Sequence, residues 1–273
     1  MENETTDQSP ADGPPWNVIE GGGPVLLTAI HAGHVVRSDL NSHLAIAAED
    51  RRREEDPLTD YFLSLGDNLV RVNRSRFECD MNRPRDNCIS DDPDDTWGLT
   101  IWKDSLSDTH KQTSYGLHDK FYAQMKDLTA RLIERHGRIL VLDLHSYNHR
   151  RDGPDAAPAD VAGNPDIDIG ATTLDKAVFG DLLDQFMNSL RQTPVRGQRP
   201  AVAENVRYPD GGNFPEWLYE IHGDRACVIT LEYKKIFMDE WSGTVDIGAV
   251  QDLRSGLMLA LQDAQYALKQ AGR

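Results

Sequence analysis

The apolar run that leads to His145 is the feature that most constrains how this chain can fold. Residues 138–147 (RILVLDLHSY) are apolar from the second residue to Leu144, with Asp143 as the one interruption. A short run of this kind, directly after Gly137, is typical of a strand buried on both faces of a parallel sheet. Ligands bind at the carboxyl ends of strands in open α/β sheets, so His145 lies where chemistry is expected.

Further strand-like runs also end in residues that can bind a metal, move a proton or hold an anion. The run 24–30 leads to His31, and the run 225–231 leads to Glu232. Residues 75–83 end in Asn82 and Arg83. Two imidazoles, a carboxylate and an amide–guanidinium pair, each at the end of a run, form the set expected of a mononuclear zinc hydrolase.

Alternation of strands and helices predicts the fold class. Leu117, Phe121, Met125, Leu128 and Leu132 follow helical spacing with one apolar face. Similar patterns predict a helix over 174–190, a strand over 201–205, a short helix over 217–222 and a last helix over about 249–271. We therefore predict an α/β fold, a single-domain three-layer α/β/α arrangement with a mixed, mostly parallel sheet.

Less regular stretches give weaker expectations. Residues 1–23 are polar and rich in Pro, Gly and acidic residues, which predicts a flexible N-terminal arm before a single domain over 24–273. Charged residues 39–55 predict a helix that ends before a proline. Residues 69–73 and 76–81 predict two short strands that pair as a hairpin. We expect long loops over residues 84–112 and 150–172.

The composition of the chain indicates which binding partners and which cellular compartment to expect. The 273 residues carry a net charge of −16, which argues against nucleic acid or an anionic membrane surface as the main partner. The three cysteines show no zinc-knuckle spacing and no disulfide framework, as expected in a reducing compartment. No apolar stretch approaches 18 residues, and the N-terminus has no signal-peptide pattern. We therefore expect a cytoplasmic protein, whose oligomeric state the sequence leaves open.

A hydrolytic zinc site needs three protein ligands and one open position, which predicts one Zn²⁺ per chain. His31 and His145 are the first two ligands. Glu55 is our choice for the third, with Asp56 and His34 as alternates.

Other residues near these runs suit the remaining roles. Glu232 suits a general base that takes a proton from water and returns it to the leaving amine. The alternative is a structural carboxylate that pairs with Lys234 or Lys235. Arg76 and Arg83 can each bind a substrate carboxylate or polarise the scissile carbonyl, or else form surface ion pairs. Asp143 can orient a metal-bound histidine or serve as a buried structural acid. The expected partner is a small molecule with a free carboxylate.

Several motifs together resemble the N-formylglutamate amidohydrolases over about residues 24–245. The most specific are DMNR at 80–83 and DLHS at 143–146. That family is similar in fold to the zinc carboxypeptidases. The resemblance implies that His31 and His145 bind zinc, that Glu232 is the base, and that Asn82 with Arg83 anchors a substrate carboxylate.

The chain departs from the carboxypeptidase motif at His34, where that motif has Glu. Residues 54–57 (EEDP), which replace an Asp-Thr-Asp-like run, and the loop 148–154 (NHRRDGP) place it in a divergent branch of the N-formylglutamate amidohydrolases. The activity implied is metal-dependent cleavage of an N-formyl or N-acyl amino acid, or of a small peptide. The alternatives are a peptidoglycan peptidase, or a non-catalytic module on the same fold that binds a small molecule or a peptide end.

Overall fold

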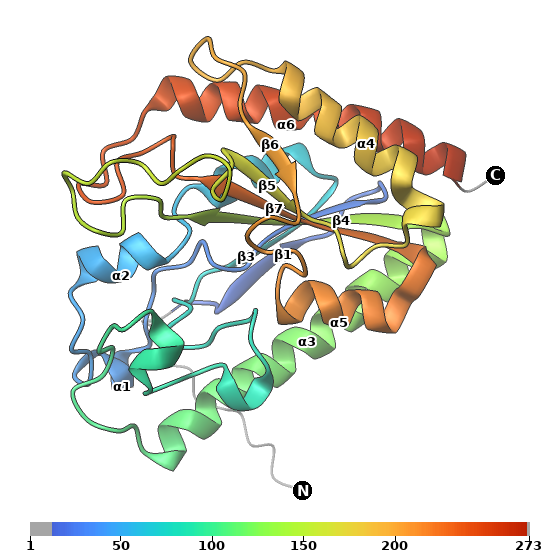
Figure 1. Ribbon diagram of the computed structural model, residues 1–273. Coiled ribbons are helices and arrows are strands. Elements are labelled where there is room, and N and C mark those ends of the chain that lie inside the picture. The colour runs from blue at the N-terminus through green and yellow to red at the C-terminus, as the bar shows by residue number, and fades with distance from the viewer. Residues whose placement is uncertain (1–12, 272–273) are drawn as a thin grey trace, which may run out of the picture.

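The computed structural model describes residues 13–271, and seven strands of this part form one mixed sheet (Figure 1). The order across the sheet is β1-β3-β2-β4-β7-β5-β6. Neighbours β3, β2, β4 and β7 run parallel, whereas β1 is antiparallel to β3 and β5 is antiparallel to β7. The strands are β1 (Trp16–Ile19), β2 (Val25–Ala29), β3 (Asn68–Val72), β4 (Ile139–Tyr147), β5 (Ile167–Gly170), β6 (Val202–Glu204) and β7 (Ala226–Lys234). The predicted α/β class with a mixed, mostly parallel sheet is confirmed.

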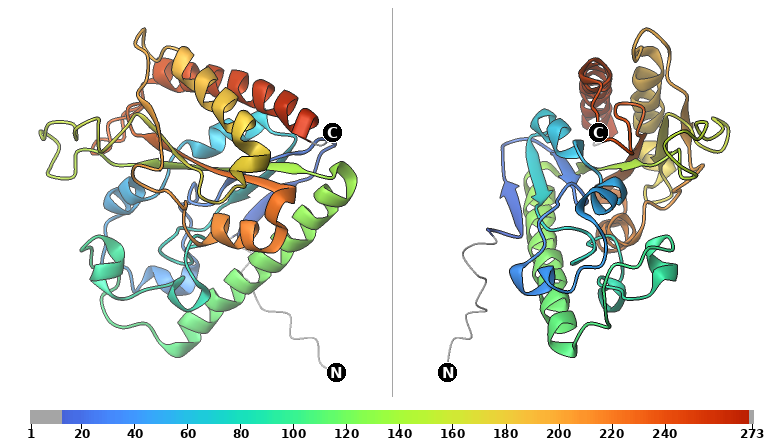
Figure 2. Two further views of the ribbon diagram at one scale, coloured as in Figure 1. Left: turned by 45° about the vertical axis from the view of Figure 1, so that its right-hand side comes forward. Right: turned by 90° about the vertical axis from the view of Figure 1, so that its left-hand side faces the viewer.

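Helices cover both faces of this sheet, as the three views show (Figures 1 and 2). One face carries α4 (Lys176–Gln192) and α6 (Ile247–Ala271), which pack side by side. The other carries α3 (Asp108–His136) and α5 (Asn213–His222). The shorter elements are α1 (Ser38–Asn41), α2 (Ala48–Glu54) and the 3-10 turns Thr59–Leu65, Arg85–Asn87, Pro93–Thr96 and Gly223–Arg225. No helix of the described residues is long and apolar enough to cross a membrane.

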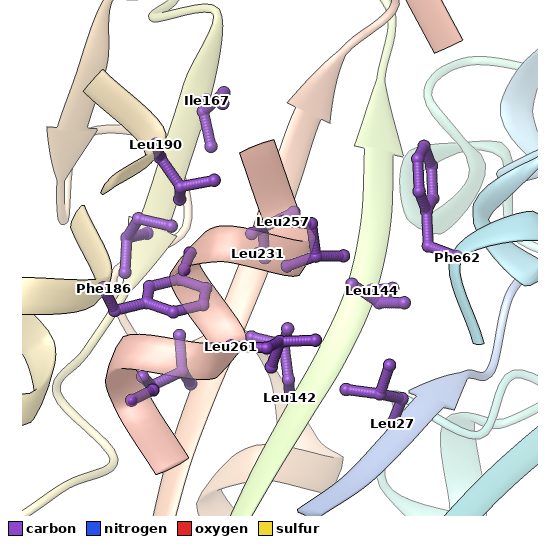
Figure 3. Close-up of a cluster of buried hydrophobic side chains, with 14 of the residues drawn as sticks. Leu27, Phe62, Leu142, Leu144, Ile167, Phe186, Leu190, Leu231, Leu257 and Leu261 are labelled. Atoms are coloured by element: carbon purple, nitrogen blue, oxygen red, sulfur yellow. The ribbon is translucent and has the colours of Figure 1, made fainter. Parts of the chain in front are cut away.

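Strand β4 lies at the centre and sets the position of the site. All nine of its residues are buried, and successive side chains point to opposite faces. Leu142 and Leu144 pack into the cluster beneath α4 and α6, together with residues such as Leu231 and Leu257 (Figure 3). His145 therefore points to the opposite face, toward the side covered by α3 and α5.

The predicted flexible arm is wrong for the part that the structure describes. Residues 1–12 lie outside the described residues, but Trp16–Ile19 forms the edge strand β1. Trp16 packs edge-to-face on Phe121 with ring centroids 5.4 Å apart, and its indole donates to Gln124 at 2.7 Å. Every second residue of this strand thus packs on the core, a signal too short to stand out in the sequence.

Three more expected elements are corrected by the structure. The helix over 39–55 is two helices, α1 and α2, separated by residues 42–47. Residues 76–81 form turns rather than a strand, because the N–H groups of Glu78 and Cys79 bond back to the Ser75 carbonyl. Consequently no hairpin forms within residues 69–81, and β3 pairs with β1 and β2 instead.

The two long loops also contain regular structure. Helix α3 begins at Asp108, inside the expected loop, because the Ser107 side chain caps it by accepting from the His110 N–H at 3.3 Å. Strand β5 lies inside the second expected loop. Two of its four residues are Asp168 and Gly170, which are uncommon in strands. The sequence therefore did not indicate a strand here, although all four residues are buried.

Candidate metal centre

Three buried side chains meet where β2 and β4 end. His31 follows β2, His145 lies near the end of β4, and Asp56 comes shortly after α2. One possible ligand atom from each lies within 4.8 Å of the others. The imidazole rings are edge-to-face with centroids 4.7 Å apart. This is the convergence that the parallel strand ends predict.

His31 is held so that one ring nitrogen faces Asp56. Its Nε2 is 2.7 Å from Asp80 Oδ1, and its Nδ1 is 3.4 Å from Asp56 Oδ2. Arg76 in turn donates two hydrogen bonds to Asp80 Oδ2, at 3.0 and 2.8 Å. Burial alone raises the pKa of the Asp80 carboxyl, but Arg76 and His31 outweigh it and hold that pKa well below its usual range. Asp80 is therefore an anionic support that fixes the His31 ring.

His145 has the same arrangement on the other side of Asp56. Its Nε2 is 2.8 Å from Asp143 Oδ2, and its Nδ1 is 3.0 Å from Asp56 Oδ2. Thr28 donates to the second oxygen of Asp143 at 2.5 Å. Burial lowers the pKa of His145, but the Asp143 carboxylate outweighs it and raises that pKa well above its usual range. Asp143 thus contacts the ring nitrogen of His145 that faces away from Asp56.

The donor set fits a divalent cation. Two Nδ1 atoms and one carboxylate face a common point, and each imidazole has a carboxylate on its Nε2, as is usual for histidines that bind metals. The Nδ1 of His31 is buried and makes no hydrogen bond within the described residues. Asp56 Oδ2 is its ion-pair neighbour at 3.4 Å, and a cation between these two atoms would satisfy the buried ring nitrogen.

The structure does not bring Glu55, our choice for the third ligand, to the two histidines. Glu55 accepts a hydrogen bond from Ser75 at 2.5 Å and bonds to His34 Nδ1, so both side chains are occupied away from the centre. Its backbone is extended, and neighbouring side chains of an extended segment point in opposite directions. The alternate, Asp56, faces the two histidines. The other alternate, His34, does not join them.

Glu232 lies directly beside this group. It is the β7 residue in register with His145 on β4, and cross-strand neighbours share a face of the sheet. Its carboxylate makes no hydrogen bond or ion pair with another described residue, so it is not the partner of Lys234 or Lys235. Burial raises the pKa of Glu232 to about 8, although His145 opposes this shift. A buried carboxylate left unpaired beside a metal-type cluster is a candidate for proton transfer.

The residues expected to hold the substrate have other partners. The Asn82 amide donates to the Gly211 carbonyl at 2.7 Å and accepts from the Phe214 N–H at 3.0 Å, so it fixes the turn before α5. The Arg83 guanidinium donates to the Asp95 carbonyl and lies 3.7 Å from the Asp95 carboxylate. Arg76 stacks on Trp97, 4.8 Å from the ring centroid. Arg76 and Arg83 line one small hollow beside Asp80.

Two residues contribute to the site in ways that sequence reasoning did not predict. Asp80 lies inside the DMNR motif, so its place in that motif was an available signal. Lys235 is fully buried, and its Nζ donates to the carbonyls of Arg53 and Glu55 and to Asn148 Oδ1, at 2.6, 2.9 and 2.9 Å. It thereby ties the end of β7 to the segment that carries Asp56. No local pattern in the sequence marks that contact.

Comparison with known proteins gives the family and the fold of this chain. The family model described as N-formylglutamate amidohydrolase matches residues 23–235. A crystal structure of N-formylglutamate amidohydrolase from Ralstonia eutropha is 20% identical, with a TM-score of 0.73, covering 94% of this chain and 99% of that one. A structure from Agrobacterium tumefaciens is 17% identical, with a TM-score of 0.67, covering 97% of this chain and 99% of that one. A search of functionally curated proteins found no match.

Proposed function

The chain belongs to the N-formylglutamate amidohydrolase family, and on that premise we propose that it is a zinc-dependent amidohydrolase. Its substrate would be an N-formyl or N-acyl amino acid, or a small peptide, with a free carboxylate. The observation that carries the proposal is the convergence of His31 Nδ1, His145 Nδ1 and Asp56, with the unpaired Glu232 next to them. We also propose a cytoplasmic location, which the three free, buried cysteines favour.

The residues divide the chemistry among them. Zinc held by His31, His145 and Asp56 would supply a Lewis acid that polarises a carbonyl and acidifies water. Glu232 takes a proton from the attacking water and returns it to the leaving amine. The Arg76 guanidinium lies next to Asp80 and stabilises negative charge that develops on the carbonyl oxygen. Asp80 and Asp143 hold the two rings in the orientation that binding requires.

A panel of N-formyl and N-acetyl amino acids tests this function. With zinc-loaded protein we expect turnover of members that have a free carboxylate, measured as release of the free amino acid. Carboxamide analogues should react more slowly, because they lack the anion that positions the substrate. If no member reacts while the metal site is full, the amidohydrolase assignment fails and a non-catalytic binding module becomes the better explanation.

Lys235→Met is expected to weaken zinc binding by about tenfold to a hundredfold, the range found when a residue that supports metal ligands is lost. The change leaves the Arg53 and Glu55 carbonyls without their donor, and the segment that carries Asp56 is then no longer fixed. The measurement is a zinc titration in competition with a chromogenic chelator.

Lys234→Met is the matched control for that prediction. Lys234 is the preceding residue and is also buried, but its Nζ donates to the Ala159 and Asn164 carbonyls, away from the Asp56 segment. Zinc affinity should stay near the wild-type value in this variant. Equal affinities in the two variants would show that Lys235 does not position the ligand.

A further inference from the structure

Arg207 has a guanidinium that pairs with no carboxylate among the described residues. It donates to Asn164 Oδ1 and, at 3.3 Å, to the Tyr208 hydroxyl, and its Nε makes no hydrogen bond. Its guanidinium carbon lies over the rings of Tyr147 and Tyr208, 4.7 and 5.3 Å from their centroids. In a chain with a net charge of −16, a partly buried cation without an anionic partner is unusual and indicates that a ligand supplies the anion.

The backbone places Arg207 next to the candidate base. Asp168 on β5 is the register partner of Glu232, so the two side chains share one face of the sheet. The Asp168 carboxylate accepts the N–H groups of Val206, Arg207 and Tyr208, at 3.1, 2.7 and 3.1 Å. The backbone of Arg207 is therefore fixed against β5, the strand that pairs with the Glu232 strand β7. Its stacking partner Tyr147 lies two residues after His145, on the same face of β4.

The other guanidinium groups around the site differ from Arg207 in this respect. Arg76 bonds to Asp80, Arg83 lies near both Asp80 and Asp95, and Arg151 pairs with Glu54. A substrate carboxylate at any of them would compete with a carboxylate of the protein. The tyrosine rings hold the plane of Arg207 without neutralising its charge. Nε makes no hydrogen bond, and the hydrogen bond of each terminal nitrogen goes to a neutral group, so N–H groups remain for a planar anion.

We propose that Arg207 binds a carboxylate of the substrate, an inference that rests on the proposed amidohydrolase function. The anion lies on the β5 side of Glu232, across the site from the hollow that Arg76 and Arg83 line. In this proposal the substrate carboxylate is recognised by the segment after β6 rather than by Asn82 and Arg83. The ligand class is an N-acyl amino acid whose carboxylate reaches Arg207 while its amide lies beside Glu232.

The test uses N-formyl-L-glutamate and its two monoamides, N-formyl-L-glutamine and N-formyl-L-isoglutamine, each of which lacks one carboxylate. Binding is measured by calorimetry to the zinc-loaded Glu232→Gln protein, in which turnover is suppressed, with and without Arg207→Gln. We expect Arg207→Gln to weaken binding of N-formyl-L-glutamate and of one monoamide by about tenfold to a hundredfold. The monoamide that lacks the recognised carboxylate should bind equally to both proteins.

Two further variants keep this result interpretable. Arg83→Gln removes a guanidinium that Asp95 already occupies, so it should leave the ranking of the three ligands unchanged. Arg207→Lys should recover part of the affinity, because an ammonium keeps the charge but not the fork. If Arg207→Gln weakens all three ligands by the same factor, or none of them, Arg207 does not read a carboxylate.

Failure of the inference and failure of the proposed function give different results. Wild-type turnover of N-formyl-L-glutamate, together with equal losses for all three ligands in Arg207→Gln, overturns the inference alone. Carboxylate-dependent binding without turnover by the wild type overturns the amidohydrolase function but supports the binding role of Arg207. Absence of binding by all three ligands contradicts both.

Discussion

Replacing Glu232 by glutamine is expected to lower kcat by about 100-fold or more, the loss typical when a general base is removed, while the protein keeps its metal. The amide has the same shape but cannot accept the proton of the attacking water. No hydrogen bond or ion pair to Glu232 is lost within the described residues, so the fold should tolerate the change. Burial raises the pKa of Glu232 to about 8, because its apolar surroundings disfavour the charged form. A neutral amide at this position should therefore cost little stability.

Glu240→Gln is the control for this loss of activity. Glu240 is also a buried carboxylate on the segment after β7, but it accepts the backbone N–H groups of His149 and Arg150, at 2.8 and 3.0 Å. We expect its replacement to affect stability more than kcat. The measurements are initial rates and metal content for both variants. A Glu232→Gln protein with wild-type kcat would remove Glu232 from the mechanism.

Those parts of the fold that depend on local patterns are the parts that sequence reasoning predicted. The nine-residue strands β4 and β7 are buried throughout, so each appears in the sequence as an apolar run. Helix α3 shows one apolar face with a regular period. Since these strands run parallel, their carboxyl ends had to meet, and the pairing of His145 with Glu232 follows. The α/β class and the location of the site could therefore be inferred without coordinates.

The errors occur where distant residues decide the structure. Residues 76–81 alternate between polar and apolar like a strand, yet Asp80 is buried because His31 and Arg76 neutralise it. The Asn82 amide bonds to residues about 130 positions away, so its place at the turn before α5 could not be predicted. Neither partner can be recognised from the local sequence. The strands β1, β5 and β6 have only three or four residues each, too few for a periodic signal.

The third metal ligand, Glu55 or Asp56, also could not be chosen from the local sequence. Both are carboxylates near the end of α2, and either suits a metal by chemistry alone. What separates them is the extended backbone after α2, which turns one side chain toward Ser75 and the other toward His145. The Asp56 N–H also bonds to the His31 carbonyl at 3.0 Å, which fixes this register. This contact spans 25 positions and has no signature in the composition of the segment.

Asp56→Ala and Glu55→Gln are therefore expected to differ sharply in metal binding. Loss of Asp56 removes the carboxylate that both histidines face, so zinc affinity should fall at least about 100-fold, beyond the loss from most supporting residues. His145→Ala should behave in the same way. Glu55→Gln should lower the melting temperature, because His34, Ser75 and Arg51 lose a charged partner, but its zinc affinity should stay near that of the wild type.

Chelator competition gives the affinity and thermal unfolding gives the stability, so the two effects are measured separately. A stabilising metal raises the melting temperature only in a protein that still binds it. Added zinc should therefore raise the melting temperature of Glu55→Gln and of the wild type, but not that of Asp56→Ala at the same concentration. The opposite pattern, with zinc stabilising Asp56→Ala and not Glu55→Gln, would mean that the backbone after α2 turns the other carboxylate to the metal. In that case Glu55 would be the third ligand, and the pairing of Asp56 with the two histidines would have no role in binding.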